Sequence, residues 1–194
     1  MLKAQLKKQD DKFKETKNDE DAWMTSLNER QVIEILSKFK IDLGVDIAAS
    51  SFYKRKKYDY ENPRLKRTIE EHFNYIKNLV QNTGLFYVED PFEEEDFENF
   101  AKLKKIAKNA LIIGDDLTVT NSKRLKKAIE MQAINGIIVK PNQCGSLTEV
   151  KKVCEIAKEN SIKIIFSHRS GETKEEILAD IAYGFEADFL KCGI

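Results

Sequence analysis

Six ionisable side chains stand at or just after the ends of short apolar runs, which are the positions where catalytic groups gather in many α/β proteins. After one longer first interval they recur roughly every 25 residues, and their chemistry changes from carboxylates to lysine and histidine. A fixed structural position that carries a different charge in each repeat is typical of an active site. The residues are Asp46, Glu89, Asp115, Lys140, His168 and Lys191.

The types of these residues indicate a definite chemistry. Carboxylates from separate strands suit Mg²⁺, which prefers oxygen ligands, so Asp46, Glu89 and Asp115 are candidate metal ligands. The lysines and the histidine could supply a base and anion-binding charge. A proton beside a carboxylate is a very weak acid, and its removal requires a cation that stabilises the doubly charged enolate. The set therefore predicts Mg²⁺-assisted proton abstraction.

Each residue also has a plainer interpretation when it is taken alone. An acidic residue after a strand is often a helix cap or a solvated loop residue, and a lysine there often extends its charge into water. A single histidine is often a hydrogen-bonded polar residue, and we assign His72, within an apolar helical pattern, to that class. Six residues in phase favour the functional interpretation, because six coincidences would otherwise be needed.

Strands and helices that alternate along the chain must position these residues. Amphipathic helices are predicted after the capping-box pattern Ser26–Glu29, after Asn62-Pro63 as far as Gly84, after Asn121, and after a second capping-box pattern at Ser146–Glu149. The alternation predicts an α/β fold with a parallel sheet, whose polar strand ends share one bowl if the sheet curls into a barrel. Strands are predicted within residues 41–51, 85–91, 111–116, 137–140, 163–168 and 187–191.

Composition narrows the class of protein. The 194 residues suffice for one domain with a core, and Lys+Arg and Asp+Glu both number 33, so no net charge favours nucleic acid or an anionic membrane. The amino terminus has no apolar signal segment, and no apolar run reaches the roughly 18 residues of a membrane-spanning helix. The three cysteines have neither metal-ligand nor paired secretory spacing. We expect a soluble, cytoplasmic protein with no nucleic-acid or membrane partner.

Residues 1–19 differ in composition from the rest of the chain. They are almost all charged or polar, with Leu2, Leu6 and Phe13 as the only large apolar side chains. Such a segment buries little apolar surface and is predicted to be a flexible or loosely helical arm. We therefore expect the folded unit to span residues 20–194, which the resemblance described below identifies as a partial barrel.

Several motifs around the six positions are highly specific. Asp-Asp-Leu-Thr-Val-Thr-Asn at 115–121 and Ser-His-Arg-Ser-Gly-Glu-Thr at 167–173 occur in this order, and the stretch from about residue 41 to the end resembles the carboxyl-terminal barrel of the enolases, the phosphopyruvate hydratases. This resemblance implies an incomplete TIM-type (β/α) barrel of about six parallel strands with helices outside. The similar segments are 45–53, 58–59, 88–92, 114–121, 139–148, 167–173 and 190–191.

The resemblance also implies a role for individual residues. Asp46, Glu89 and Asp115 would hold the principal Mg²⁺. Lys140 would take the proton from 2-phosphoglycerate on its way to phosphoenolpyruvate, and Lys191 would steady the substrate carboxylate.

Further roles follow for the phosphate end of the substrate. Arg169 and Ser170 would bind the phosphate, and His168 would contact the substrate beside them. Upstream, residues 18–23 resemble the family's Gly-Asp-Glu-Gly loop, which makes Glu20 the acid that assists departure of the hydroxyl.

Six strands cannot close an eight-stranded barrel at normal tilt and shear. Compared with enolases, the chain has no counterpart of the amino-terminal domain or of the first two barrel strands. Two sheet edges would then carry unpaired backbone groups. We therefore expect a partner, which is either a second copy of this chain or a separate polypeptide that complements the barrel.

Three functions are compatible with these features. The first is an Mg²⁺-dependent enolase-type lyase that acts on a phosphorylated three-carbon acid. The second is a catalytically inactive, truncated enolase paralogue that serves as a binding or regulatory module. The third, an acid-sugar dehydratase or racemase, is disfavoured because such enzymes usually lack the phosphate motif found at 167–173.

Overall fold

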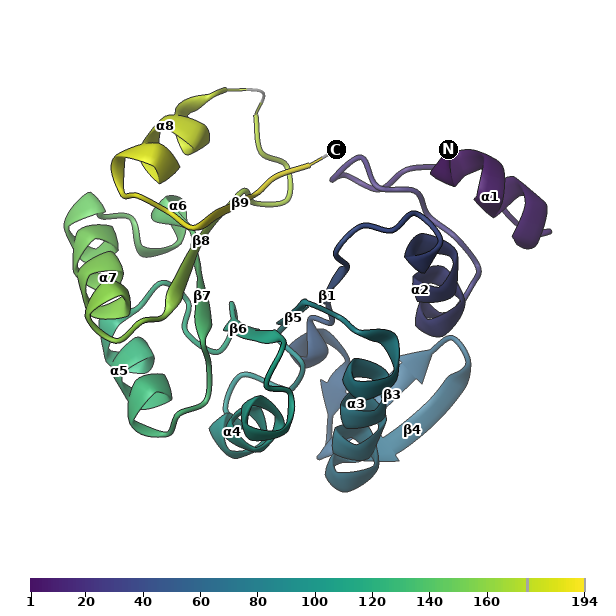
Figure 1. Cartoon of the computed structure of the whole chain (residues 1–194), viewed down its shortest axis with the longest axis horizontal. Helices are drawn as coiled ribbons and strands as arrows, with labels where there is room; N and C mark the ends of the chain where they lie inside the picture. The colour runs from purple at the N-terminus through teal and green to yellow at the C-terminus, as the bar shows by residue number, and fades with distance from the viewer. Residues whose placement is uncertain (174, 194) are drawn as a thin grey trace.

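The main sheet is a curled half-barrel of six parallel strands with helices on its outside (Figure 1). The computed structural model describes residues 1–173 and 175–193. Neighbouring strands follow one another in the order β1-β5-β6-β7-β8-β9, so the predicted incomplete TIM-type barrel is confirmed. The strands are β1 (Gly44–Asp46), β5 (Tyr87–Glu89), β6 (Leu111–Gly114), β7 (Gly136–Val139), β8 (Lys163–Ser167) and β9 (Phe189–Lys191).

Both faces of the middle strands are buried, which explains their continuous apolar sequences. Register partners in a parallel sheet point to the same side, and Ile113, Ile138 and Ile165 form a buried cluster of their own. Residues of the opposite parity join the larger core against the helices, as Ile112 and Ile164 do. The two clusters therefore define a concave inner face and a helix-covered outer face.

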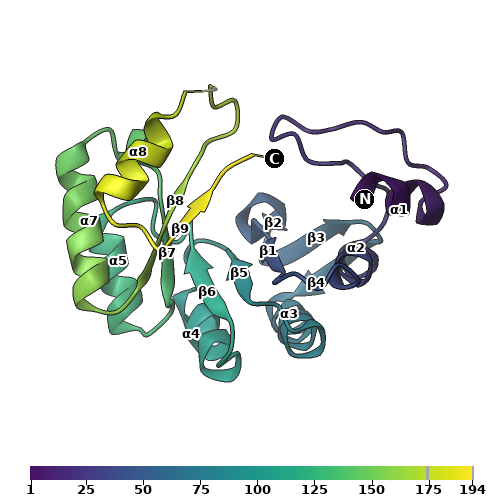
Figure 2. The ribbon, with the colours of Figure 1, turned by 45° about the horizontal axis from the view of Figure 1, so that its top comes forward.

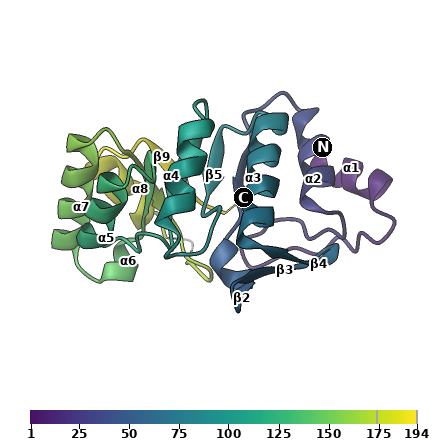
Figure 3. The ribbon, with the colours of Figure 1, turned by 90° about the horizontal axis from the view of Figure 1, so that it is seen from below.

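The helices lie one after another around the outer face (Figures 1 and 3). Asn121 accepts hydrogen bonds from the amides of Lys123 and Arg124, which confirms it as a helix cap, and Gly84 ends α3 in the left-handed region that glycine favours. The helices and one 3₁₀ turn are α1 (Leu2–Gln9), α2 (Glu29–Ser37), η1 (Ala49–Phe52), α3 (Ile69–Thr83), α4 (Phe97–Ile106), α5 (Ser122–Glu130), α6 (Pro141–Cys144), α7 (Leu147–Glu159) and α8 (Ile177–Gly184).

A small antiparallel sheet replaces part of one predicted helix. Asn62-Pro63 lies between β3 (Lys57–Glu61) and β4 (Arg64–Thr68), which pair with each other and with β2 (Tyr53–Lys54), so the prediction that Asn62-Pro63 opens a helix was wrong. The helix instead begins after Thr68, whose side chain forms a capping box with Glu71. Tyr58 and Tyr60 alternate with charged residues, and this alternation is typical of a strand.

The capping boxes predicted at Ser26–Glu29 and Ser146–Glu149 were also wrong in detail. Helix α2 begins after Asn28, which caps it together with Gln31, because the Ser26 hydroxyl donates to Asp10 instead. At α7 the Ser146 side chain makes no capping bond, and Glu149 accepts the backbone amide of Ser122 at the start of α5. In both cases a side chain that would have formed the local cap instead makes a hydrogen bond with a distant part of the chain.

The amino-terminal residues are attached to the segment that leads into α2. Leu6 of α1 is buried, and the buried carboxylate of Asp10 accepts hydrogen bonds from the Thr25 hydroxyl at 2.6 Å and the Ser26 amide at 2.8 Å. Residues 1–19, predicted as an arm, thus contain a helix and a buried anchor, while a domain boundary near residue 19 stays a prediction. Within the described ranges, no helix is both long and apolar enough to cross a membrane.

His72 is a buried neutral side chain that gives stability a pH dependence. Its ring stacks on Tyr58, and its nitrogens bond the Tyr60 hydroxyl at 2.7 Å and the Pro91 carbonyl at 2.8 Å. Burial lowers the pKa of His72 to about 4. Because the unfolded chain takes up a proton near pH 6.5 and the folded chain does not, stability should fall as pH drops from about 6.5 to 4, by up to about 3 kcal/mol.

Urea unfolding from pH 4 to 7.5 measures this effect in the wild type and in His72→Gln. The wild type should lose more unfolding free energy over this range than the variant does. Equal pH dependence in the two proteins would contradict the assignment of this loss to His72.

Candidate active site

The strands bring the predicted ionisable residues to one end of the sheet. Asp46 and Glu89 are register partners at the ends of β1 and β5. Glu89 pairs with Ile113, so Asp115, two residues later, faces the same side. By the same alternation Lys140 follows Ile138 on the inner face. These side chains therefore share the carboxyl-terminal mouth of the half-barrel.

Lys191 connects the two edge strands across this mouth. Its Nζ lies 2.7 Å from Asp46 Oδ2 and 2.8 Å from Glu89 Oε1, and Asp46 belongs to β1 whereas Lys191 belongs to β9. Burial and then the charge of Asp46 raise the pKa of Glu89 to about 7, against the opposite effect of Lys191. Burial lowers the pKa of Lys191. The charges of Glu89 and Asp46 together raise it by a larger amount, so the pKa of Lys191 lies above that of an ordinary lysine. The mouth thus holds a lysine ammonium between two predicted metal ligands.

Lys140 forms the second ion pair of the mouth. Its Nζ donates to Oδ2 of Asp115, and the two side chains are 15% and 10% exposed. The Lys140 amide donates to the Thr120 hydroxyl at 2.9 Å, which fixes the backbone at the end of β7. The other oxygen of Asp115, Oδ1, is buried and has no hydrogen-bond partner in the described part of the chain.

The oxygen donors at this mouth fit a hard divalent cation. A buried carboxylate oxygen without a partner is costly unless a cation meets it, and Asp115 Oδ1 is such an atom. Among the described residues, Asp90, Asp115 and Asp116 form an acidic group whose ligand atoms lie within 4.8 Å of one another. Both oxygens of Asp90 already accept backbone N–H groups. We therefore favour Asp115, which belongs both to this acidic group and to the predicted ligand set, as a metal ligand. The set of Asp46, Glu89 and Asp115 stays a prediction.

Residues 167–173 and the upstream loop at 18–23 meet although they are far apart in sequence. His168 Nε2 lies 3.5 Å from Glu20 Oε1, and the Ser170 hydroxyl donates to Asp19. The end of β9 lies beside the amino-terminal segment (Figures 1 and 2). The structure thus brings Glu20, His168 and Ser170 to one side of the mouth, while Arg169 next to them is exposed.

The upstream loop turns without the glycines of the enolase loop. Asn18 Oδ1 accepts the amides of Glu20 at 3.1 Å and Ala22 at 2.9 Å, and Asp21 adopts φ 64°. Aspartate tolerates this left-handed conformation better than most residues do. The carboxylate of Glu20 is thereby presented beside His168.

Comparison with known proteins decides the family. A family model described as "Enolase, C-terminal TIM barrel domain" matches residues 30–194. The chain belongs to the enolase family. It is 41% identical to the enolase of Pyrobaculum aerophilum over 197 residues, which cover 96% of this chain and 47% of that protein. It is 40% identical to the enolase of Methanosphaera stadtmanae over 205 residues, which cover 99% of this chain and 50% of that protein.

A third enolase, from Sulfurisphaera tokodaii, is 46% identical over 154 residues, which cover 79% of this chain and 36% of that protein. The chain thus spans about half the length of the first two of these enolases. The activity of the whole proteins therefore comes to this chain only as a proposal.

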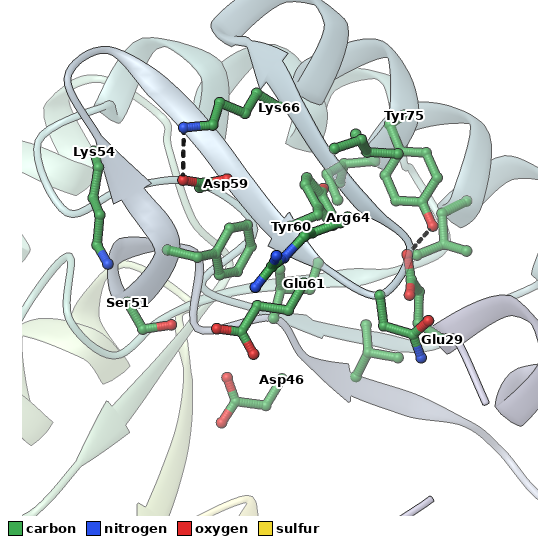
Figure 4. Close-up of a pocket in the computed structure, with 17 residues that line it drawn as sticks. Glu29, Asp46, Ser51, Lys54, Asp59, Tyr60, Glu61, Arg64, Lys66 and Tyr75 are labelled. Atoms are coloured by element: carbon green, nitrogen blue, oxygen red, sulfur yellow. Dashed lines mark hydrogen bonds and ion pairs between the residues drawn. The ribbon is translucent and has the colours of Figure 1, made fainter. Parts of the chain in front are cut away.

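A cavity of this enolase-family barrel lies beside the mouth rather than in it. It has a volume of about 1020 Å³ and lies between β1, η1, the β3–β4 hairpin, α2 and α3. Figure 4 shows Asp46 at its wall, together with the Lys66–Asp59 ion pair and the Tyr75–Glu29 hydrogen bond. Of the predicted metal ligands only Asp46 borders it. The cavity therefore borders the edge strand β1.

Two residues of the mouth were not predicted from the sequence. The Tyr87 hydroxyl donates to Glu89 Oε2, and burial raises the pKa of that phenol. Asp90 is buried next to Glu89, and burial raises the pKa of its carboxyl despite the two backbone N–H groups that it accepts. Strand alternation could have placed Tyr87 on the inner face, two residues before Glu89, whereas nothing in the sequence separated Asp90 from a loop residue.

Proposed function

We propose that this chain carries the catalytic half of an Mg²⁺-dependent phosphopyruvate hydratase, which dehydrates 2-phosphoglycerate to phosphoenolpyruvate. The observation that carries the proposal is the meeting of two lysines and three carboxylates at one mouth, with the Lys140 ammonium against Asp115 and the Lys191 ammonium between Asp46 and Glu89. Family membership of residues 30–194 supports the same reaction.

Each residue has a part in this reaction. Lys140 in its neutral form would take the proton from the carbon next to the substrate carboxylate, and Lys191 would bind that carboxylate. Mg²⁺ held by Asp46, Glu89 and Asp115 would neutralise the charge that develops as the proton leaves.

At the other end, Arg169, Ser170 and His168 would bind the phosphate. Glu20 would then protonate the departing hydroxyl. The distance of 3.5 Å between Glu20 Oε1 and His168 Nε2 supports this role, because it would bring the acid close to the proposed phosphate site.

A direct assay tests this function. Purified protein with 2-phosphoglycerate and Mg²⁺ should produce the ultraviolet absorbance of phosphoenolpyruvate, and chelation of Mg²⁺ should abolish it. No turnover, together with stabilisation by 2-phosphoglycerate, would instead support the binding or regulatory module.

One observation favours that second function for the chain on its own. The Asp46 side chain is 40% exposed at the open edge, so water reaches a site where developing charge is better stabilised in a dry environment. We infer that the site needs a cover. We also infer that the protein works in the cytoplasm, because its phosphorylated substrate would be found there.

We further propose that the cover is amino-terminal enolase sequence. In the described chain β1 and β9 each have one neighbour in the sheet, and Ile41, Phe189 and Leu190 are exposed near these edges. An extended segment laid along β1 would pair its free backbone groups and close the cavity beside it.

Sedimentation equilibrium at micromolar concentration tests this partner. The probe is the portion of the Methanosphaera stadtmanae enolase that this chain does not match. We expect a one-to-one complex with that probe. Self-association without binding of the probe would replace the proposed cover by a second copy of the chain, and a monomer under both conditions would refute the need for either partner.

A further inference from the structure

Asp90 is a buried acidic residue with no role in the reaction described above. It directly follows β5, is 2% exposed, and has a φ of 40°. A positive φ is uncommon for a residue other than glycine, although aspartate and asparagine tolerate it best. Both features indicate that the surrounding structure holds this residue in place.

The contacts of Asp90 join the ends of three strands. Oδ1 accepts the amide of Asp115 at 2.9 Å, and Oδ2 accepts the amide of Asp116 at 2.7 Å. The Asp90 amide donates to the Ile113 carbonyl at 3.0 Å, and its carbonyl accepts the Ala49 amide at 3.2 Å. One residue thus connects β5, the end of β6 and the segment that follows β1.

Asp115 is consequently held on both sides of its α-carbon. Asp90 accepts its amide, while its carbonyl accepts the amides of Thr118 at 3.0 Å and Val119 at 2.8 Å. With its backbone fixed in this way, Asp115 turns Oδ2 towards Lys140 and leaves Oδ1 buried without a partner.

Only a carboxylate satisfies the two neighbouring amides in this geometry. Asp115 and Asp116 each direct an N–H group at a different oxygen of Asp90. An asparagine side chain has one acceptor oxygen and would set its NH₂ group against the second N–H. The two charge-assisted bonds are therefore specific to aspartate at this position.

We propose that Asp90 is a positioning residue that sets the orientation of Asp115 as a metal ligand and as the ion-pair partner of Lys140. The part of this proposal that concerns the metal rests on the proposed function. The part that concerns the ion pair with Lys140 does not. Groups that orient metal ligands typically change metal affinity by 10- to 100-fold when they are replaced.

Two variants and one matched control test the proposal. Asp90→Asn keeps the shape and the tolerance of positive φ, and Asp90→Gly deletes both acceptors and serves if the first variant does not fold. Asn135→Ala is the control, because Asn135 accepts the Ile112 amide at 2.6 Å and donates to the Ala110 carbonyl at the opposite end of β6. The probe is Mn²⁺, which suits the same oxygen ligands and whose free ion is counted by electron paramagnetic resonance.

We expect Asp90→Asn to weaken Mn²⁺ binding by about 10- to 100-fold and Asn135→Ala to leave it unchanged. Mn²⁺ binding equal to that of the wild type in the Asp90 variant would overturn the proposal.

A readout that needs no metal separates this proposal from the proposed function. Amide hydrogen exchange at Asp115 and Asp116 should be about tenfold faster in the Asp90 variant. If the wild type binds no Mn²⁺, the metal site of the proposed function fails, and faster exchange alone would still support Asp90 as the residue that holds Asp115. Unchanged exchange in that case would overturn the proposal.

Discussion

Replacement of Lys140 by alanine is expected to lower the turnover of 2-phosphoglycerate by about 10³- to 10⁴-fold, the upper range for loss of a general base. Lys140 directly follows the buried strand β7, and its amine reaches the mouth where Asp115 lies. Alanine removes the proposed base but leaves the carboxylates and Lys191 in place. The loss should therefore appear in kcat rather than in substrate affinity.

Lys140→Arg separates the role of base from the role of charge. Arginine keeps a cation beside Asp115 but does not release its proton near neutral pH, so this variant should be as inactive as Lys140→Ala. The matched control is Lys163→Ala, which breaks a 2.6 Å ion pair with Asp188 at the opposite end of the sheet. Activity retained in Lys140→Arg, or lost equally in Lys163→Ala, would refute Lys140 as the base.

Replacement of Asp115 by alanine is expected to weaken Mg²⁺ binding on the order of 10²-fold or more. The proposed ligand itself is removed, and loss of a residue that merely orients a ligand already costs about 10- to 100-fold in metal affinity. The variant also deletes the buried oxygen without a partner and leaves the Lys140 ammonium unpaired. Isothermal titration with Mg²⁺ measures the affinity.

Asp188→Ala is the control for this variant, because Asp188 bonds Lys163 and the Ile164 amide far from the mouth. It should bind Mg²⁺ as the wild type does. Unchanged affinity in Asp115→Ala would remove Asp115 from the metal site, whatever the control shows.

The strands of the half-barrel could be predicted because burial on both faces makes them continuous apolar runs. Alternation allows only one of Asp115 and Asp116 to face the mouth, and the family motif selected Asp115, which the structure pairs with Lys140. The helix starts were less predictable. The Ser26 hydroxyl donates to Asp10 instead of capping α2. The β3–β4 hairpin occupies residues that had been assigned to the start of α3.

Contacts across the open side of the barrel could not be read from the residues. The bond from Lys191 to Asp46 depends on how far the sheet curls, because β9 and β1 are opposite edges. Proximity of Glu20 to His168 was implied only by the family resemblance, since 18–23 and 167–173 belong to different elements. Asp90 was missed because its importance lies in which backbone amides it meets.

Exchange of the proton next to the substrate carboxylate tests the role of Lys140 most directly. In D₂O with Mg²⁺, proton NMR follows loss of that signal from 2-phosphoglycerate, with the chain alone and with the complementing half of the Methanosphaera stadtmanae enolase. We predict exchange that requires Mg²⁺ and is absent in Lys140→Ala. No exchange under either condition, or exchange that persists in Lys140→Ala, would contradict proton abstraction by Lys140.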